Sequence, residues 1–267
     1  MADETVKKSC IAKKIGLGVA LLVIAGGVFV YMNMGSIAKT IAEKVGSDTL
    51  GVKVSISSID ISLKNKSVLV SGLSVANPKS FKKPHAMKVG SIHIAMDSFS
   101  KELLTFNDVS VKGSELFLEV TPKGTNLSAI KKNIDQNKKP PTKPKEESSK
   151  AAPKVILKNF LFAGAQLHPS QTLISGHDLK DVNVPDIKLT SIGVKQNGVL
   201  AREAIAQIWE AISKGALKAS SNAGLLEGMS ADSLKDLSST MGISNIGGSA
   251  SGKVEKAKEG IKSLFGQ

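Results

Sequence analysis

Cysteine, aromatic and acidic residues are all scarce in this 267-residue chain. A single cysteine, Cys10, excludes a disulfide framework and a multi-cysteine metal site. Aromatic residues make up 4% of the chain, too few for the stacking surfaces of single-strand nucleic-acid binders, so we expect no nucleic-acid partner. Acidic residues number 23 against 36 Lys and Arg, which excludes an acid-rich disordered chain. With 41% hydrophobic residues, the composition is that of a folded protein.

One long apolar run stands out at residues 15–34, with Asn33 as its only strongly polar member. A helix of that length spans about 30 Å, the thickness of the hydrocarbon layer of a bilayer. Lysines cluster before the run and are nearly balanced by acids after it, which places residues 1–14 in the cytoplasm and the rest outside. The predicted anchor residues include Ile15, Leu21, Leu22, Val23, Ile24, Val28, Phe29, Val30 and Tyr31.

A cleaved secretory signal is the alternative interpretation of this run. Ser36-Ile37-Ala38 offers small residues at the two positions that a signal peptidase reads. The apolar run is longer than the roughly 7–15 residues of a signal core, however, which favours a retained signal-anchor.

Residues 35–130 predict a bent, mainly antiparallel sheet behind a short helix. Ile37, Ile41 and Val45 are at helical spacing, and the apolar period then changes from 3.6 to 2. The alternation slips by one residue at Ser57-Ser58, which indicates a β-bulge. Short turns, including Lys112-Gly113 and Lys123-Gly124, favour an antiparallel meander with one apolar face. The predicted strands cover residues 52–63, 68–75, 89–97, 106–111 and 116–120.

A Lys- and Pro-rich segment at residues 131–154 interrupts this pattern and predicts a flexible linker or an exposed loop. A second β half with a packing helix follows at residues 155–218. A turn is expected at His168-Pro169, and the two halves form either one sheet or two lobes. The strands are expected at residues 155–161, 172–175, 182–184 and 187–192.

The helical period returns at residues 200–217, where an apolar stripe predicts a helix that packs on the sheet. The Gly- and Ser-rich tail, residues 219–267, contains a weak helix at 231–237 and an amphipathic helix at 253–265. The fold class expected is therefore α+β, with an N-terminal transmembrane helix, a β-groove domain and helices toward the C-terminus.

The stretch Ser71-Gly72-Leu73-Ser74-Val75-Ala76-Asn77-Pro78-Lys79-Ser80-Phe81 resembles the N-terminal region of AsmA-like proteins of Gram-negative envelopes. Val89–Phe99 resembles the strand that follows in that family, Asn126-Leu127 its later Asn-Leu pair, and Val184–Leu189 its short members. Ser80 replaces the Gly of the family pattern. The resemblance covers most of residues 15–215. It implies an inner-membrane anchor, with the bulk of the chain in the periplasm as a single β-groove module, and a role in the cell envelope.

No catalytic constellation is present in the sequence. Gly72-Leu73-Ser74-Val75-Ala76 lacks the final Gly of a nucleophile elbow. The four histidines (His85, His93, His168 and His177) lack metal-ligand spacing. GGSASGK at residues 247–253 lacks the Ser or Thr of a phosphate loop. We expect no enzyme, no metal and no cofactor.

Two hypotheses for function remain. In the first, the apolar sheet face holds the acyl chains of a membrane phospholipid, for lipid transport or outer-membrane integrity; whether that face is open, or is ordinary core under the helix at 200–217, stays undecided. In the second, the protein is a bitopic scaffold for envelope protein partners and holds no lipid. The candidate groove residues are Val54, Ile56, Ile59, Ile61, Leu63, Ile92, Ile94, Val109, Val111, Leu116 and Leu118.

Overall fold

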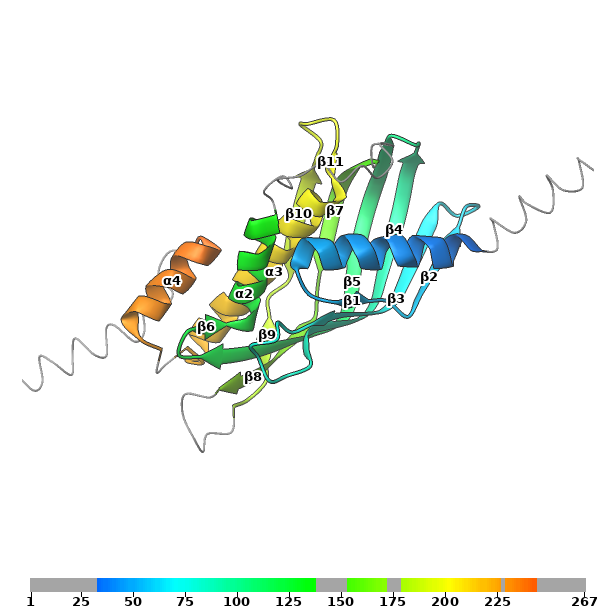
Figure 1. Ribbon diagram of the computed structural model, residues 1–267. Helices are drawn as coiled ribbons and strands as arrows, with labels where there is room; N and C mark the ends of the chain where they lie inside the picture. Colours follow the sequence, from blue (N-terminus) through cyan, green and yellow to red (C-terminus); the bar gives the residue numbers. More distant parts are fainter. Residues whose placement is uncertain (1–32, 138–152, 172–178, 227–228, 244–267) are drawn as a thin grey trace, which may run out of the picture.

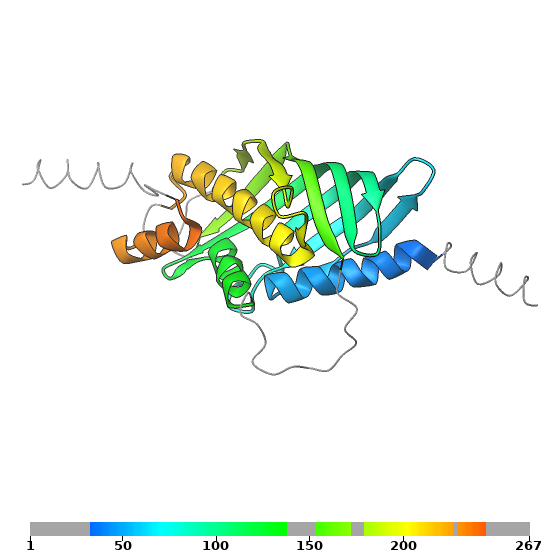
Figure 2. The same cartoon turned by 90° about the horizontal axis from the view of Figure 1, so that it is seen from above.

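The computed structural model describes residues 33–137, 153–171, 179–226 and 229–243. These residues form an α+β fold with one 11-stranded mixed sheet, mostly antiparallel, and helices on one of its faces (Figures 1 and 2). We call the helix-covered face of the sheet the inner face. The coarse fold class predicted from the sequence is therefore confirmed.

The first half of the sheet is the predicted antiparallel meander. A helix, described over residues 33–50 and here called the leading helix, precedes the meander. The strands of the meander are β1 (Val54–Ser55), β2 (Ser58–Ser62), β3 (Ser67–Ala76), β4 (His85–Phe99) and β5 (Leu103–Thr121). The turn predicted at Lys112-Gly113 is wrong, because β5 continues through both residues and pairs with β4 on either side of them.

The second half of the chain joins the same sheet rather than a second lobe. Strand β5 pairs in parallel with β7 (Lys154–Phe162) and then with β8 (Ala165–Gln171). Three shorter strands complete this side: β9 (Val182–Val184), β10 (Ile187–Ile192) and β11 (Val199–Leu200). The turn predicted at His168-Pro169 is wrong, since both residues belong to β8. The chain bends earlier, at Gly164 (φ 63°), and the strand predicted at 172–175 lies outside the described residues.

Helix α2 (Asn126–Asn137) lies between β6 (Gly124–Thr125) and β7 in the chain, and α3 (Ala201–Asn222) and α4 (Ala231–Met241) follow the last strand. Helix α2 covers part of the segment predicted as a linker; its residues Ile130 and Ile134 are buried, and residues 138–152 lie outside the described residues. Helix α3 confirms the helix predicted at 200–217. Helix α4 confirms the weak helix, while the predicted helix at 253–265 lies outside the described residues.

The leading helix confirms the predicted short helix but not its apolar face. Ile37 and Ile41 are 50% and 58% exposed, whereas Ala38 and Ala42 pack against a cluster formed by Ile56, Ile59 and Val70. The cause is a stripe of small residues, Gly35, Ala38, Ala42 and Gly46, which allows the helix to lie close to the strands. A Cβ at position 35 would clash with the backbone carbonyl oxygen of Ile59.

A row of glycines crosses the sheet and bends it. The registers β3–β4 and β4–β5 place Gly72, Gly90 and Gly113 opposite one another, and the constant register of β5 with β7 and β8 places Gly164 level with Gly113. We call these four residues the glycine row. Strands alternate faces with a period of two, yet Val70 and Leu73 both face the core. Gly72 has a positive φ (63°), a backbone conformation that permits this shift without a change of register.

The change of face predicted at Ser57-Ser58 lies level with the glycine row. The N–H of Ser57 donates to the carbonyls of both Ser71 (3.0 Å) and Gly72 (3.2 Å), and β1 and β2 are separated at this point. The register with β3 is the same before and after the separation, so there is no extra residue and the predicted β-bulge is wrong. The edge strand changes face together with its neighbours instead.

Candidate functional site

The inner face of the sheet is the candidate functional surface, and the glycine row divides it into two parts. All the predicted groove residues except Leu63 belong to its two hydrophobic clusters. We call the part under α2 and α3 the covered part, and the part between the glycine row and the turns at 63–66 and 99–102 the open part. The sequence pattern did not reveal this division.

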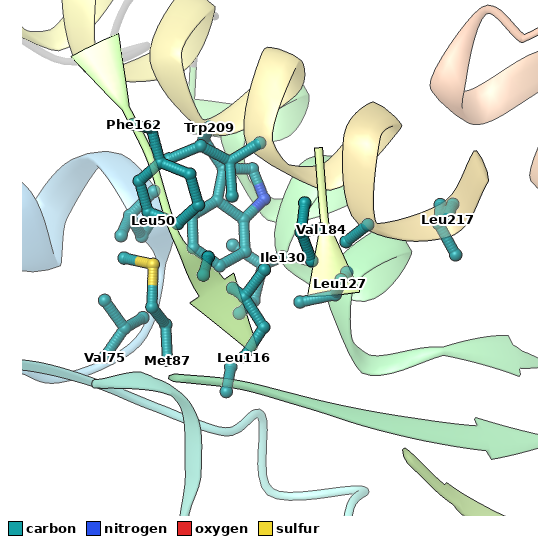
Figure 3. Packing of buried hydrophobic residues seen from close by; sticks show 14 of the residues in the cluster. Leu50, Val75, Met87, Leu116, Leu127, Ile130, Phe162, Val184, Trp209 and Leu217 are labelled. Carbon is teal, nitrogen blue, oxygen red and sulfur yellow. The ribbon is translucent and has the colours of Figure 1, made fainter. Parts of the chain in front are cut away.

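The covered part is a filled core. Leu116 and Leu118 have no exposed surface, and Trp209 of α3 is 3% exposed. Figure 3 shows the Trp209 ring between α3 and the sheet, with Phe162, Met87 and Leu116 around it. Dense side-chain packing leaves no space for an acyl chain here, so this part corresponds to the alternative that the sequence left open, ordinary core under the helix at 200–217.

The open part keeps apolar side chains only half-buried. Ile61, Ile92, Ile94 and Val109 all retain accessible surface, although they belong to the same apolar face. The leading helix covers their neighbours Ile56 and Ile59 but leaves this group partly accessible. These side chains therefore form a contiguous aliphatic surface that the described helices cover only in part.

Hydrogen bonds from side chains hold the leading helix beside this surface. Glu43 Oε1 accepts from the N–H of Ile56 (2.7 Å), and Ser47 Oγ accepts from the N–H of Val54 (2.9 Å). Lys39 Nζ donates to the carbonyl of Ser57 (3.2 Å). These groups satisfy backbone atoms of the edge strand where β1 and β2 are separated, so the helix is fixed in orientation and the edge is protected from pairing with another chain.

The residues that carry the family resemblance form a structural clamp at the far end of the sheet. Asn126 Nδ2 donates to Asn77 Oδ1 (2.7 Å) and to the carbonyl of Phe117 (2.7 Å), and Asn126 Oδ1 accepts from the N–H of Glu119 (3.0 Å). The carboxylate of Glu119, a residue only 3% exposed, accepts from the N–H groups of Lys82 (2.9 Å) and Lys83 (3.0 Å). Asn77 and Asn126, which are 49 positions apart in the sequence, thus fix the loop after β3.

A shallow hollow of ≈ 480 Å³ lies over strands β2 to β5, and most of its lining surface is apolar. Asp60, His93 and Asp108 contribute its polar groups, and its apolar lining includes Ile61 and Ile94 of the open part. His168 Nδ1 lies 2.8 Å from Asp181 Oδ1, and its ring stacks on Phe117 with 5.3 Å between centroids. No group of three or more His, Cys, Asp and Glu side chains gathers in the described parts of the chain. His177 lies outside them.

The predicted membrane anchor cannot be located on this surface, because Ile15 through Tyr31 lie outside the described residues. Within the part of the chain that the structure does describe, no helix is both long enough and apolar enough to cross a bilayer.

Comparisons with known proteins give no family assignment. A scan against protein-family models found no match to this chain, and searches of curated proteins and of solved structures found no significant match either.

Proposed function

We propose that this protein is a membrane-anchored envelope protein of the AsmA-like type, held in the inner membrane by residues 15–34, with its sheet domain in the periplasm. There it holds a phospholipid acyl chain on the open part of the inner face. The single observation that carries the proposal is the half-burial of Ile61, Ile92, Ile94 and Val109 on an otherwise completed apolar face. The role is one of binding, with no chemical step and no cofactor.

The strength of such binding follows from apolar area. Burial of one methylene contributes about 0.8 kcal/mol, so a chain that covers the open part with six methylenes gains about 5 kcal/mol. That gain is enough for transient holding but not for permanent storage, since immobilising a flexible chain opposes it. The open part is thus suited to a lipid in transit.

Photo-crosslinking of the full-length chain in membranes tests the proposal. A phospholipid with a diazirine in its acyl chain is incorporated, irradiated, and mapped by mass spectrometry. Crosslinks at Ile92, Ile94 or Val109 are expected, and Val109→Lys should remove them because a charge is not tolerated beside an acyl chain. Crosslinks confined to residues 15–34 would contradict the proposal.

A scaffold for envelope protein partners is the second candidate. The filled core under α2 and α3 favours it, since Leu116 and Leu118 leave no space there for lipid. Under this alternative, the lipid probe should give no crosslinks at Ile92, Ile94 or Val109, and Val109→Lys should abolish the capture of a protein partner by a protein crosslinker. Matched irradiation of the Leu118→Ile variant, which changes only the covered part, provides the control.

A further inference from the structure

The large hydrophobic residues that remain exposed lie on one side of the molecule. Three lie at one end of the sheet: Leu63 between β2 and β3 (43% exposed), Phe99 as the last residue of β4 (64%) and Val194 between β10 and β11 (43%). The other two, Ile37 and Ile41, lie on the leading helix. Among the described residues no other large hydrophobic side chain is as exposed, so this concentration calls for a partner.

Each of the three turns also carries an exposed lysine beside its apolar residue. The pairs are Leu63-Lys64, Phe99 with Lys101, and Val194-Lys195. We call the turns at 63–66, 99–102 and 194–197 the docking edge. An apolar side chain flanked by lysines suits the boundary of a bilayer, where the apolar group enters the acyl layer and the ammonium group remains among anionic headgroups.

Backbone hydrogen bonds shape these turns. The N–H of Ser100 donates to the carbonyl of Leu103 (2.8 Å), and Ser100 Oγ accepts from the N–H of Leu103 (2.9 Å). The N–H of Gly198 donates to the carbonyl of Gly193 (2.8 Å). Phe99 and Val194 are therefore presented by closed turns, which lowers the entropy lost on docking.

The described chain begins at this same end. The first described residues of the leading helix lie beside β2 and the β2–β3 turn, as Figures 1 and 2 both show, and a Cβ at Gly35 would clash with the backbone carbonyl of Ile59 in β2. The last two residues of the apolar run 15–34 belong to this described part of the helix, so an anchor in that run brings the docking edge to the membrane surface.

The opposite end of the sheet provides an internal comparison. It also carries exposed lysines, among them Lys79, Lys83 and Lys123, but no exposed large hydrophobic residue within the described parts of the chain. Positive charge alone therefore does not distinguish the two ends. The pairing of charge with apolar side chains does.

We propose that the docking edge lies on the bilayer, with Leu63, Phe99 and Val194 in the interfacial layer and Lys64, Lys101 and Lys195 against anionic phospholipid headgroups. This inference rests on the membrane anchoring in the proposed function. It adds an orientation: the strands point away from the membrane, and the open part of the inner face lies next to the lipid surface from which an acyl chain would enter.

Depth-dependent fluorescence quenching on the full-length chain tests the inference. In a Cys10→Ser background, Phe99→Cys is labelled with an environment-sensitive fluorophore, and the matched control is Lys123→Cys at the opposite end. Both are reconstituted in vesicles of phosphatidylethanolamine and phosphatidylglycerol, with brominated acyl chains as quencher. Strong quenching at position 99 and none at 123 is expected. Replacing Lys64, Lys101 and Lys195 with Gln should weaken docking roughly fivefold for each lysine.

Vesicle flotation separates the two proposals. A chain that floats while position 99 is quenched no more than position 123 overturns the docking edge and leaves the anchor standing. A chain that does not float overturns both. Label at position 99 that is shielded by a second copy or by another protein, without quenching by lipid, also overturns the docking edge.

Discussion

Gly90 and Gly113 face each other across β4 and β5, and a Cβ on Gly90 would lie 3.4 Å from the Gly113 carbonyl oxygen. Gly72 continues the same line on β3, and both Gly72 and Gly113 have positive φ. Because the alternation of faces shifts at this line in three adjacent strands, the sheet bends there as a unit. The bend separates the covered part of the inner face from the open part.

The glycine row can be tested through Gly113. Gly113→Ala is expected to destabilise the fold by about 1–2 kcal/mol, because a Cβ is unfavourable at φ 64° even where there is space for it. Denaturant unfolding followed by the fluorescence of Trp209, the only tryptophan, measures the change. Gly90→Ala, which has no positive φ, is the control and should cost less; equal losses would contradict a special role for the backbone at 113.

The orientation of the leading helix predicts opposite effects for adjacent residues. Ala42→Leu should destabilise by about 1–3 kcal/mol, because Ala42 packs against the cluster of Ile56, Ile59 and Val70. Ile41→Ala should change stability by less than about 0.5 kcal/mol, because Ile41 is 58% exposed. Thermal unfolding of both variants checks the pair, and the reverse ranking would mean that the isoleucines face the sheet.

Substitution of the clamp residue Asn126 should lower the stability of the fold more than substitution of most other polar residues. Asn126→Ala removes three hydrogen bonds and leaves buried partners on Glu119 and Phe117 without them, at a cost of about 2–4 kcal/mol. Asn137→Ala, which loses a hydrogen bond to the exposed carbonyl of Asp48, is the matched control and should cost under about 1 kcal/mol. Similar unfolding midpoints for the two variants would show that the hydrogen bonds of the clamp make no special contribution to stability.

Asp97 offers a pH-dependent prediction. Lys158 donates a hydrogen bond to Asp97 (3.0 Å) and, by this bond and its charge, lowers the pKa of that carboxyl below the ordinary 3.8. A lowered pKa means that the ion pair contributes stability above the unfolded-state pKa, and that this is lost as pH falls through the folded-state pKa. Since the pair is exposed, the effect on stability should be small.

An NMR titration of Asp97 measures this shift directly. Lys158→Met should return the pKa of Asp97 toward its ordinary value, whereas Lys101→Met should not. An unchanged titration in Lys158→Met would assign the shift to another group.

Much of the local structure can be predicted from residue patterns. Alternation predicted the meander, the slip at Ser57-Ser58 located the change of face on the edge strand, and the 3.6-residue period predicted α3. The failures share one origin, the effect of distant packing on ambiguous local signals. Lys112-Gly113 and His168-Pro169 have the composition of turns, but pairing with neighbouring strands keeps both within a strand. Helix α2 was missed because its lysines obscured Ile130 and Ile134, which become buried where the helix packs against α3, α4 and the sheet.

The chain's own pattern determined that one apolar sheet face exists and which residues lie on it, since period depends only on backbone geometry. Tertiary structure decided the rest: that β5 and β7 run parallel in a single sheet, that Ala42 rather than Ile41 faces the strands, and that α3 fills one part of the inner face while another stays half-buried. Burial of a side chain depends on which distant segment packs against it, and no local period encodes that choice.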